Sequence, residues 1–178
     1  MQRVVLIGFM GAGKTSVGRA LARRLRWAFH DLDDVIEQRE QQTVSQIFAS
    51  AGETGFRHIE NVALHDLLQG SAAAGDLVLA LGGGAFVQAQ NRVLLEQAGA
   101  ITILLEAPLE ELKRRCRGER KARPLAQQEE RFAELFAARR ADYGLAQFRV
   151  QTMGKPVEQV AAEVERLLKA VVKPGVKK

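Results

Sequence analysis

Short apolar runs alternate with longer amphipathic segments along this chain. Three runs, Arg3–Ile7, Leu77–Leu81 and Ala100–Leu105, are continuous and rich in leucine or β-branched residues. A run that is apolar on both faces suits a strand that helices cover on each side, as in a parallel sheet. The alternation therefore predicts an α/β fold in which right-handed crossovers join parallel strands.

The segments between these runs carry apolar residues at helical spacing. Lys14–Leu25 repeats one at every fourth position. Thr43–Gln46 has the form of a capping box and predicts a short helix that ends at Ala49. Pro108, followed by two acidic residues, marks another helix start, because proline suits the first helical position and acids suit the positive end of the dipole. Further helices are predicted over Val35–Glu40, Phe56–Leu68 and Pro156–Val172.

Composition narrows the class of protein. The chain has 178 residues, of which 47% are hydrophobic and 26% charged, and this predicts one domain over residues 1–172 with a basic tail at 173–178. The lone cysteine, Cys116, excludes a disulfide scaffold and a cysteine-built zinc site and fits a reducing compartment. No stretch reaches the ~20 apolar residues of a membrane span, and a secretory signal is not evident. We expect a cytoplasmic protein without a membrane partner.

The charge of the chain is concentrated in one segment. Seven Lys and Arg residues lie between Lys113 and Arg123, against the single acid Glu119. Such a cluster suits phosphate, either in a nucleic acid or in a small polyanion. The segment has no aromatic residue on which a base could stack. We therefore expect a small polyanionic ligand and no nucleic-acid partner.

The strongest motif is a phosphate-binding loop. Gly8–Thr15 matches G-x-x-x-x-G-K-[ST] in full, after a predicted strand and before a predicted helix. Its backbone N–H groups and the helix N-terminus suit phosphate oxygens. Lys14 is placed for the β- and γ-phosphates, and the Thr15 hydroxyl for Mg²⁺. The predicted nucleotide contacts are Gly11, Ala12, Gly13, Lys14, Thr15 and Ser16.

Acidic residues follow the next apolar pair, Ala28-Phe29. In an extended chain the spacing of Asp31 and Asp33 puts both carboxylates on one side, about 6–7 Å apart. One could then approach the metal while the other meets an acceptor hydroxyl. The alternative is an acidic N-cap for the helix at Val35–Glu40, which suits Asp34 but does not require Asp31.

Two further features suggest an acceptor with a carboxylate. Arg57 stands near a helix start, where the dipole disfavours a cation, and arginine binds a carboxylate as a bidentate fork. Gly82–Gly84 follows the second buried run and suits close approach of the backbone to a ligand. That run ends without an aspartate, so Asp31 is the substitute carboxylate for Mg²⁺. A guanine-selecting Asn-Lys-x-Asp loop, typical of GTPases, is missing from the sequence.

In this order the motifs resemble those of the shikimate kinase family over Val4–Leu168. The segments that carry the resemblance are Gly8–Thr15, Phe29–Asp33, Gly52-Glu53 with Phe56-Arg57, Gly82–Gly84, Arg123–Leu125 and Arg139 four residues before Tyr143. The resemblance implies a monomeric three-layer α/β/α P-loop NTPase fold with a five-stranded parallel sheet, like nucleoside monophosphate kinases, with a lid at about 113–125. It also implies transfer of the ATP γ-phosphoryl group to the shikimate 3-hydroxyl, on the route to chorismate and the aromatic amino acids.

The resemblance also implies roles for single residues. Asp33 would be the general base and hold ring hydroxyls, and Asp31 would contact Mg²⁺ through water. Arg139 is favoured over Arg140 as the second carboxylate clamp by its register against Tyr143. The remaining implied contacts are Arg57 and Gly83 to shikimate, Arg123 from the lid to the phosphates, and Lys155 with Arg115 on the adenine side. Two alternatives stay open, a related sugar-acid kinase such as a gluconate kinase and a nucleotide-binding regulatory module without turnover.

Overall fold

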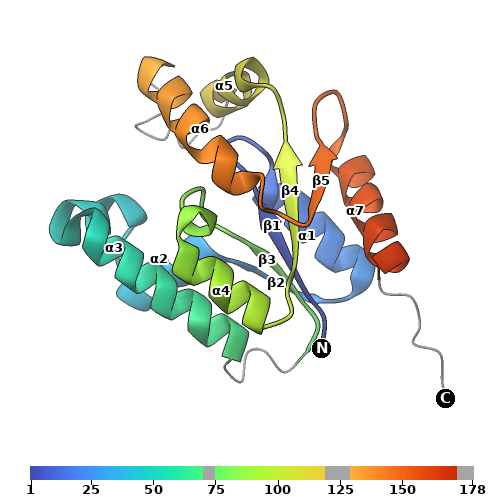
Figure 1. Ribbon diagram of the computed structural model, residues 1–178, viewed down its shortest axis with the longest axis horizontal. Coiled ribbons are helices and arrows are strands. Elements are labelled where there is room, and N and C mark those ends of the chain that lie inside the picture. Colours follow the sequence, from blue (N-terminus) through green and yellow to red (C-terminus); the bar gives the residue numbers. More distant parts are fainter. Residues whose placement is uncertain (70–74, 119–128, 172–178) are drawn as a thin grey trace.

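A five-stranded parallel sheet forms the centre of the molecule (Figure 1). The computed structural model describes residues 1–69, 75–118 and 129–171. The strand order is β2-β3-β1-β4-β5, and every pair of neighbours is parallel. This confirms the predicted α/β class and five-stranded sheet. The strands are β1 (Arg3–Ile7), β2 (Ala28–Asp31), β3 (Leu77–Ala80), β4 (Ile101–Glu106) and β5 (Phe148–Gln151).

Helices cover both faces of the sheet, as Figure 1 shows. Helices α1 and α7 lie side by side on one face, and α3 and α4 cover the other, with α2 packed on α3. Helices α5 and α6 stand beyond the end of the sheet to which the strands point. The helices are α1 (Lys14–Leu25), α2 (Leu32–Glu40), α3 (Val44–Gln69), α4 (Ala89–Gln97), α5 (Leu109–Gly118), α6 (Glu129–Tyr143) and α7 (Val157–Val171), with the 3₁₀ turn η2 (Ala85–Val87).

The three apolar runs are the three central strands. Residues in β1, β3 and β4 are almost all buried, whereas the edge strands β2 and β5 are mostly half-buried or exposed. A strand with sheet neighbours on both sides and helices on both faces has no solvated surface, so its sequence is apolar throughout. This is why the pattern revealed the centre of the sheet more clearly than its edges. Among the described residues, no helix is long and apolar enough to cross a membrane.

Two helix boundaries test the sequence prediction. The capping box is present: the backbone N–H of Thr43 donates to Gln46 Oε1 at 2.8 Å, and the N–H of Gln46 donates to Thr43 Oγ1 at 3.3 Å. The helical stretch that it opens runs to Gly52, where φ is 67° and the backbone is not helical, so the predicted end at Ala49 lies close to the observed one. Glycine accepts this left-handed conformation without a Cβ clash, and a second helical stretch, which contains the predicted Phe56–Leu68, continues α3 to Gln69. The second boundary, the start of α2, lies at the site and is described there.

The register of the sheet brings the functional motifs to one edge. Leu6 pairs with Ala80, and Ala80 pairs with Asp31, so β1, β3 and β2 finish level with one another. The loops that carry Gly8–Thr15, the acidic pair and Gly82–Gly84 therefore leave the sheet side by side. Ligands of open α/β sheets bind outside this carboxyl edge.

Candidate active site

The loop Gly8–Thr15 connects β1 to α1. Gly13 is the N-cap of α1 with φ 91°, a left-handed conformation that turns the chain into the helix. Since glycine has no side chain with which to cap, the first N–H groups of α1 remain for a ligand. The Lys14 ammonium group lies over this loop and donates to the carbonyl oxygens of Gly8 at 2.9 Å and Phe9 at 3.1 Å. The N–H groups at the start of α1 together with one cation suit phosphate.

Thr15 and Asp31 form a pair of oxygen ligands beside this loop. The Thr15 hydroxyl donates to Asp31 Oδ2 at 2.6 Å, across the gap between α1 and the end of β2. Magnesium prefers oxygen ligands and takes few of them from protein, keeping water and phosphate for the rest. The pair fits that requirement. In the described part of the chain, no group of three or more His, Cys, Asp and Glu residues is arranged to hold a metal.

The acidic segment is not extended, which corrects the geometry predicted for it. Asp31 ends β2 and is the N-cap of α2: its Oδ1 accepts a hydrogen bond from the N–H of Asp33 at 3.1 Å. The helix begins at Leu32, so Asp33 lies in its first turn, and the predicted start at Val35 is late. Asp31 therefore caps α2 with one carboxylate oxygen and accepts from Thr15 with the other. Its geometry is compatible both with a helix cap and with a contact to Mg²⁺.

Gly82–Gly84 is the segment on which the predicted acceptor residues converge. Each of the three glycines faces one of those side chains at the point where a Cβ would stand. A Cβ on Gly82 would lie 2.5 Å from Asp33 Oδ1, and one on Gly83 would lie 3.2 Å from Arg139 Nη1. A Cβ on Gly84 would lie 2.6 Å from Arg57 Nη1. Side chains from α2, α6 and α3 thus approach three consecutive backbone positions after β3.

Arg57 is held in a largely buried setting. Its Nη1 donates to both carboxylate oxygens of Glu60, at 3.1 and 2.9 Å, and its Nη2 lies 3.5 Å from Glu53. Its guanidinium group lies 5.3 Å from the ring centre of Phe56, which stacks on Phe48 at 4.3 Å. The Arg57 Nε is buried and has no hydrogen-bond partner among the described residues. A buried donor without a partner is costly, so the guanidinium group has capacity for a further acceptor.

Glu60 is the site residue that the sequence analysis missed. Its side chain is 1% exposed, and burial raises its pKa, against the opposing influence of Arg57. It would lie 3.4 Å from a Cβ on Gly82, so it borders the same segment as Asp33. The signal was present in the sequence, because an acid three residues after Arg57 shares its helix face. The acidic partner that the helix position of Arg57 suggested is thus partly supplied by the protein itself.

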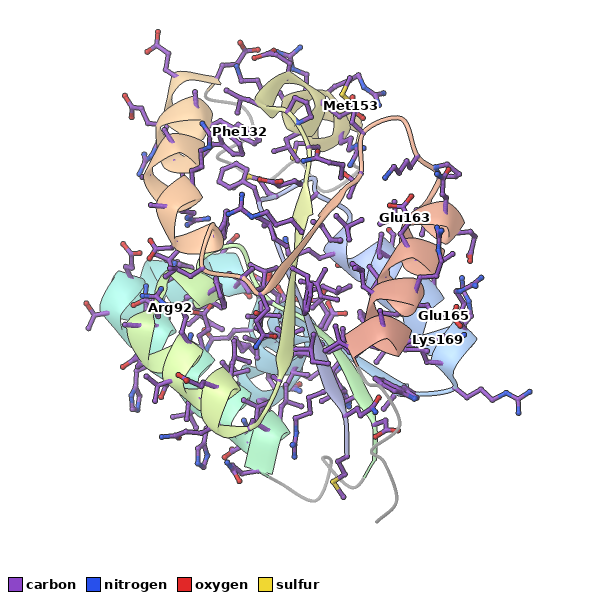
Figure 2. The ribbon with its side chains drawn as sticks, turned by 45° about the vertical axis from the view of Figure 1, so that its right-hand side comes forward. Arg92, Phe132, Met153, Glu163, Glu165 and Lys169 are labelled. Atoms are coloured by element: carbon purple, nitrogen blue, oxygen red, sulfur yellow. The ribbon has the colours of Figure 1, made fainter. Side chains whose placement is uncertain are left out.

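Arg139 reaches the segment from the last turns of α6. Its guanidinium group lies 5.8 Å from the ring centre of Phe9 in the phosphate-binding loop, while Arg140 is exposed. Phe9 in turn packs edge-on against Phe132 and Phe136 of α6, at 5.0 and 5.3 Å between ring centres. Phe132 is labelled in Figure 2. The placement thus favours Arg139 over Arg140 as the residue directed to the site.

Tyr143 fixes the same end of α6. Its hydroxyl donates a short hydrogen bond to the carbonyl oxygen of Gly83. Burial raises the pKa of this phenol to about 12, so it stays a neutral donor at physiological pH. Tyr143 thus has a structural role, which it performs at the site.

Arg115 and Lys155, the residues assigned to the adenine side, both lie at the segment that follows β5. Arg115 donates to Thr152 Oγ1 at 2.9 Å and to its carbonyl oxygen at 3.0 Å, and the Lys155 ammonium group donates to Glu163 at 2.7 Å. Glu163 is labelled in Figure 2, on α7. Arg123 and most of the predicted lid lie outside the described residues; residues 113–118 belong to α5.

Comparisons with known proteins agree with one another. The family profile SKI, shikimate kinase, matches residues 10–169. A shikimate kinase of Geobacter sulfurreducens is 42% identical over 92% of this chain and 88% of its own. The crystal structure of a Bacteroides thetaiotaomicron shikimate kinase superposes with a TM-score of 0.86 at 30% identity, covering 94% of this chain and 98% of its own.

Two further solved structures bear on the acceptor and on the fold. A shikimate kinase from Acinetobacter baumannii in complex with shikimate is 35% identical, covers 99% of this chain and 96% of its own, and has a TM-score of 0.84. A gluconokinase from Sinorhizobium meliloti 1021 has a TM-score of 0.65 at 18% identity, covering 96% of this chain and 95% of its own, a likeness that concerns the fold alone.

Proposed function

The chain belongs to the shikimate kinase family of ATP-dependent phosphotransferases, and from this premise we propose that it phosphorylates the 3-hydroxyl group of shikimate, giving shikimate 3-phosphate and ADP. The observation that carries the proposal is the convergence of Asp33, Arg139 and Arg57 on Gly82–Gly84. One carboxylate and two guanidinium groups there suit a ligand with hydroxyl groups and a carboxylate. The relative from Acinetobacter baumannii, whose structure is a complex with shikimate, supports this acceptor.

The arginines bind and orient the acceptor. Arg57 offers a buried Nε without a partner among the described residues and approaches Gly84, and Arg139 approaches the neighbouring Gly83. Two charged forks on one carboxylate fix the orientation of the ring as well as its position. Because phosphoryl transfer depends mainly on alignment and charge neutralisation, this orientation is a large part of catalysis.

Asp33 holds the acceptor hydroxyl and takes its proton. Its carboxylate stands at Gly82, one residue from the Gly83 backbone that we assign to the substrate. The neighbouring Asp31 is engaged by Thr15 and by the N–H of Asp33, so the two carboxylates have separate tasks. A general base within hydrogen-bond reach of the attacking hydroxyl contributes about 10²–10⁴-fold to the rate.

The nucleotide lies along Gly11–Ser16, and Lys14 neutralises the charge of its β- and γ-phosphates. When bound, Mg²⁺ would supply further charge neutralisation, with Thr15 as its ligand and Asp31 in contact through water. The Arg123 contact to the phosphates and the closing of a lid at about 113–125 remain part of the proposal. We also propose that Lys155 and Arg115 flank the adenine.

The surroundings of the enzyme are part of the same proposal. We place it in the cytoplasm, since its lone cysteine, Cys116, fits a reducing compartment. We also propose that it is a monomer, as the family resemblance implies. Size-exclusion chromatography with light scattering tests the monomer. A mass near the 19.6 kDa of one chain is expected, and a concentration-independent mass of twice that would contradict it.

The activity is tested by ADP release with ATP and Mg²⁺ in three parallel assays, with shikimate, with gluconate and without an acceptor. We expect turnover with shikimate alone. Turnover with gluconate would indicate a sugar-acid kinase, and equal rates in all three assays would contradict acceptor phosphorylation. Binding of ATP without turnover in any assay would indicate a regulatory module.

A further inference from the structure

The two faces of the acceptor site are carried by separate pieces of the chain. Gly83 belongs to the segment between β3 and α4, whereas Arg139 belongs to α6, more than fifty residues later. A carboxylate that contacts both requires a fixed distance between these pieces. Tyr143 bonds the end of α6 to Gly83 directly, and a second residue, on α4, contributes to this distance. The inference about that residue rests on the proposed function, because it concerns the proposed Arg139 clamp.

Arg92 of α4 contacts both pieces at once. Its Nη1 donates to the carbonyl oxygens of Phe86 at 2.8 Å and Val87 at 2.7 Å, in the turn η2 that follows the glycines. The same Nη1 lies 3.1 Å from Asp142 Oδ1, in the last turn of α6. Figure 2 shows Arg92 at the junction of α4 and α6. One side chain thus joins η2 to the end of α6.

Asp142 is close in sequence to two side chains that reach the site. Tyr143 donates to the Gly83 carbonyl, and Arg139 stands one helical turn before it, facing Gly83. A shift of Asp142 along or around α6 therefore moves Arg139 relative to Gly83. Because helical residues move as a unit, a contact made at Asp142 is transmitted to Arg139 without direct contact.

The turn η2 is fixed from the other side as well. Asn91, which precedes Arg92, is fully buried; it donates to the Ala85 carbonyl at 2.9 Å and accepts from Asn61 of α3 at 2.7 Å. Since α3 also carries Arg57, η2 has a defined position relative to that arginine. Arg92 then extends the same chain of contacts to the helix of Arg139.

We propose that Arg92 is a positioning residue, which sets the place of Arg139 over Gly83 by bonding η2 and Asp142 together. The ion pair itself is partly exposed, with 25% and 29% of the two side chains accessible. Exposed pairs of this kind contribute little to global stability. Loss of the pair is therefore expected to change acceptor binding more than the melting temperature, and a merely structural role would do the reverse.

The test is a double-mutant cycle between Asp142→Ala and Arg139→Ala in the full-length protein. Steady-state KM values for shikimate and ATP are measured with the melting temperature of each variant. Asp142→Ala should raise the KM for shikimate by about tenfold, the equivalent of one lost charged hydrogen bond. In the Arg139→Ala background the same change should have no further effect. The KM for ATP should stay unchanged throughout.

Two other variants control for folding and location. All three Arg92 contacts are made by Nη1, and the lysine ammonium group of Arg92→Lys ends one bond nearer the backbone, so this variant should reproduce the effect of Asp142→Ala on the KM for shikimate. Arg149→Ala is the matched control: Arg149 donates to the Gly144 carbonyl at 3.2 Å, beside the same end of α6 but from β5. It should leave both KM values unchanged. If Asp142→Ala does not fold, Arg92→Lys takes its place in the cycle.

The outcomes separate this inference from the proposed function. Suppose that Arg139→Ala raises the KM for shikimate, but Asp142→Ala either leaves this KM unchanged or raises it by the same factor in both backgrounds. The Arg139 clamp then stands, and the positioning role of Arg92 is overturned. If Arg139→Ala leaves the KM for shikimate unchanged, the clamp itself is overturned, and the positioning role with it. Non-additivity confined to the KM for shikimate supports the proposal.

Discussion

Replacement of Gly84 by alanine is a direct test of the acceptor geometry. The added Cβ would stand 2.6 Å from Arg57 Nη1 and 2.7 Å from Arg57 Cζ. Non-bonded heavy atoms prefer a separation of about 3.5 Å, and Arg57 Nη2 stands closer to this Cβ than Nη1 does, so the guanidinium group must retreat by about 1 Å. The end of an arginine side chain can retreat, but this one lies against Glu60 and the stacked ring of Phe56. Alanine at position 84 therefore displaces the clamp while leaving the sheet and its core unchanged.

The expected size of the effect follows from the contact that is weakened. Complete loss of a charged hydrogen bond, as in Arg57→Ala, costs about 1.5–3 kcal/mol, or roughly 10- to 150-fold in binding. A displacement of about 1 Å loses part of this, so Gly84→Ala should raise the KM for shikimate by about 5- to 50-fold. The KM for ATP should not change, because the atoms nearest to the added Cβ all belong to Arg57 and none to the phosphate-binding loop.

The control for Gly84→Ala is a second glycine, Gly75, which lies just before β3. Among the residues that the structure describes, a Cβ added there would have no heavy atom within 4 Å, so Gly75→Ala should leave both KM values and the melting temperature unchanged. Circular dichroism and steady-state kinetics on the two variants decide the matter. A folded Gly84→Ala protein with a wild-type KM for shikimate would refute the idea that Arg57 binds the acceptor from this position.

Three further predictions concern the acidic residues. Asp33→Asn should lower kcat by about 10²-fold or more, with the KM for ATP little changed; near-wild-type turnover would exclude it as the base. Asp31→Asn keeps an N-cap side chain, so the melting temperature should hold while the Mg²⁺ concentration for half-maximal activity rises, and an unchanged Mg²⁺ titration would contradict its role. Burial raises the pKa of Glu60 above its ordinary 4.5. As the pH rises above 4.5, the folded protein therefore retains a proton that the unfolded chain releases, and the free energy of unfolding falls. Glu60→Gln should abolish this fall in urea unfolding measured between about pH 4.5 and 7, and parallel curves would count against it.

The centre of the fold and the phosphate-binding loop could be predicted because their signals are local. A central parallel strand is buried on both faces, so β1, β3 and β4 are visible as apolar runs. The loop at Gly8–Thr15 is set by backbone requirements within a single short segment. The edge strands were less accessible, because solvent on one side weakens the apolar pattern.

The acceptor site required the tertiary structure. Asp33, Arg57 and Gly83 were predicted one at a time, but their convergence depends on the strand register and on the approach of α2, α3 and α6 to one segment. The extended geometry predicted for Asp31 and Asp33 was wrong because the capping bond of Asp31 starts the helix at Leu32. After Asp31 the chain could either continue as a strand or start a capped helix, and the spacing of the two aspartates does not show which of these forms.

The division between nucleotide and acceptor also explains why fold similarity is a weak guide to substrate. The phosphate-binding loop is built by β1 and α1 at the centre of the sheet, and a gluconokinase shares the fold at 18% identity. The proposed acceptor contacts come from three elements outside that unit, and they meet on a segment without Cβ atoms. Small changes in how α3 or α6 approaches Gly82–Gly84 would change the distance between the two guanidinium groups without disturbing the nucleotide loop. Specificity in such a protein therefore resides in the packing of these helices on the glycines, and in the residues, such as Arg92, that hold them there.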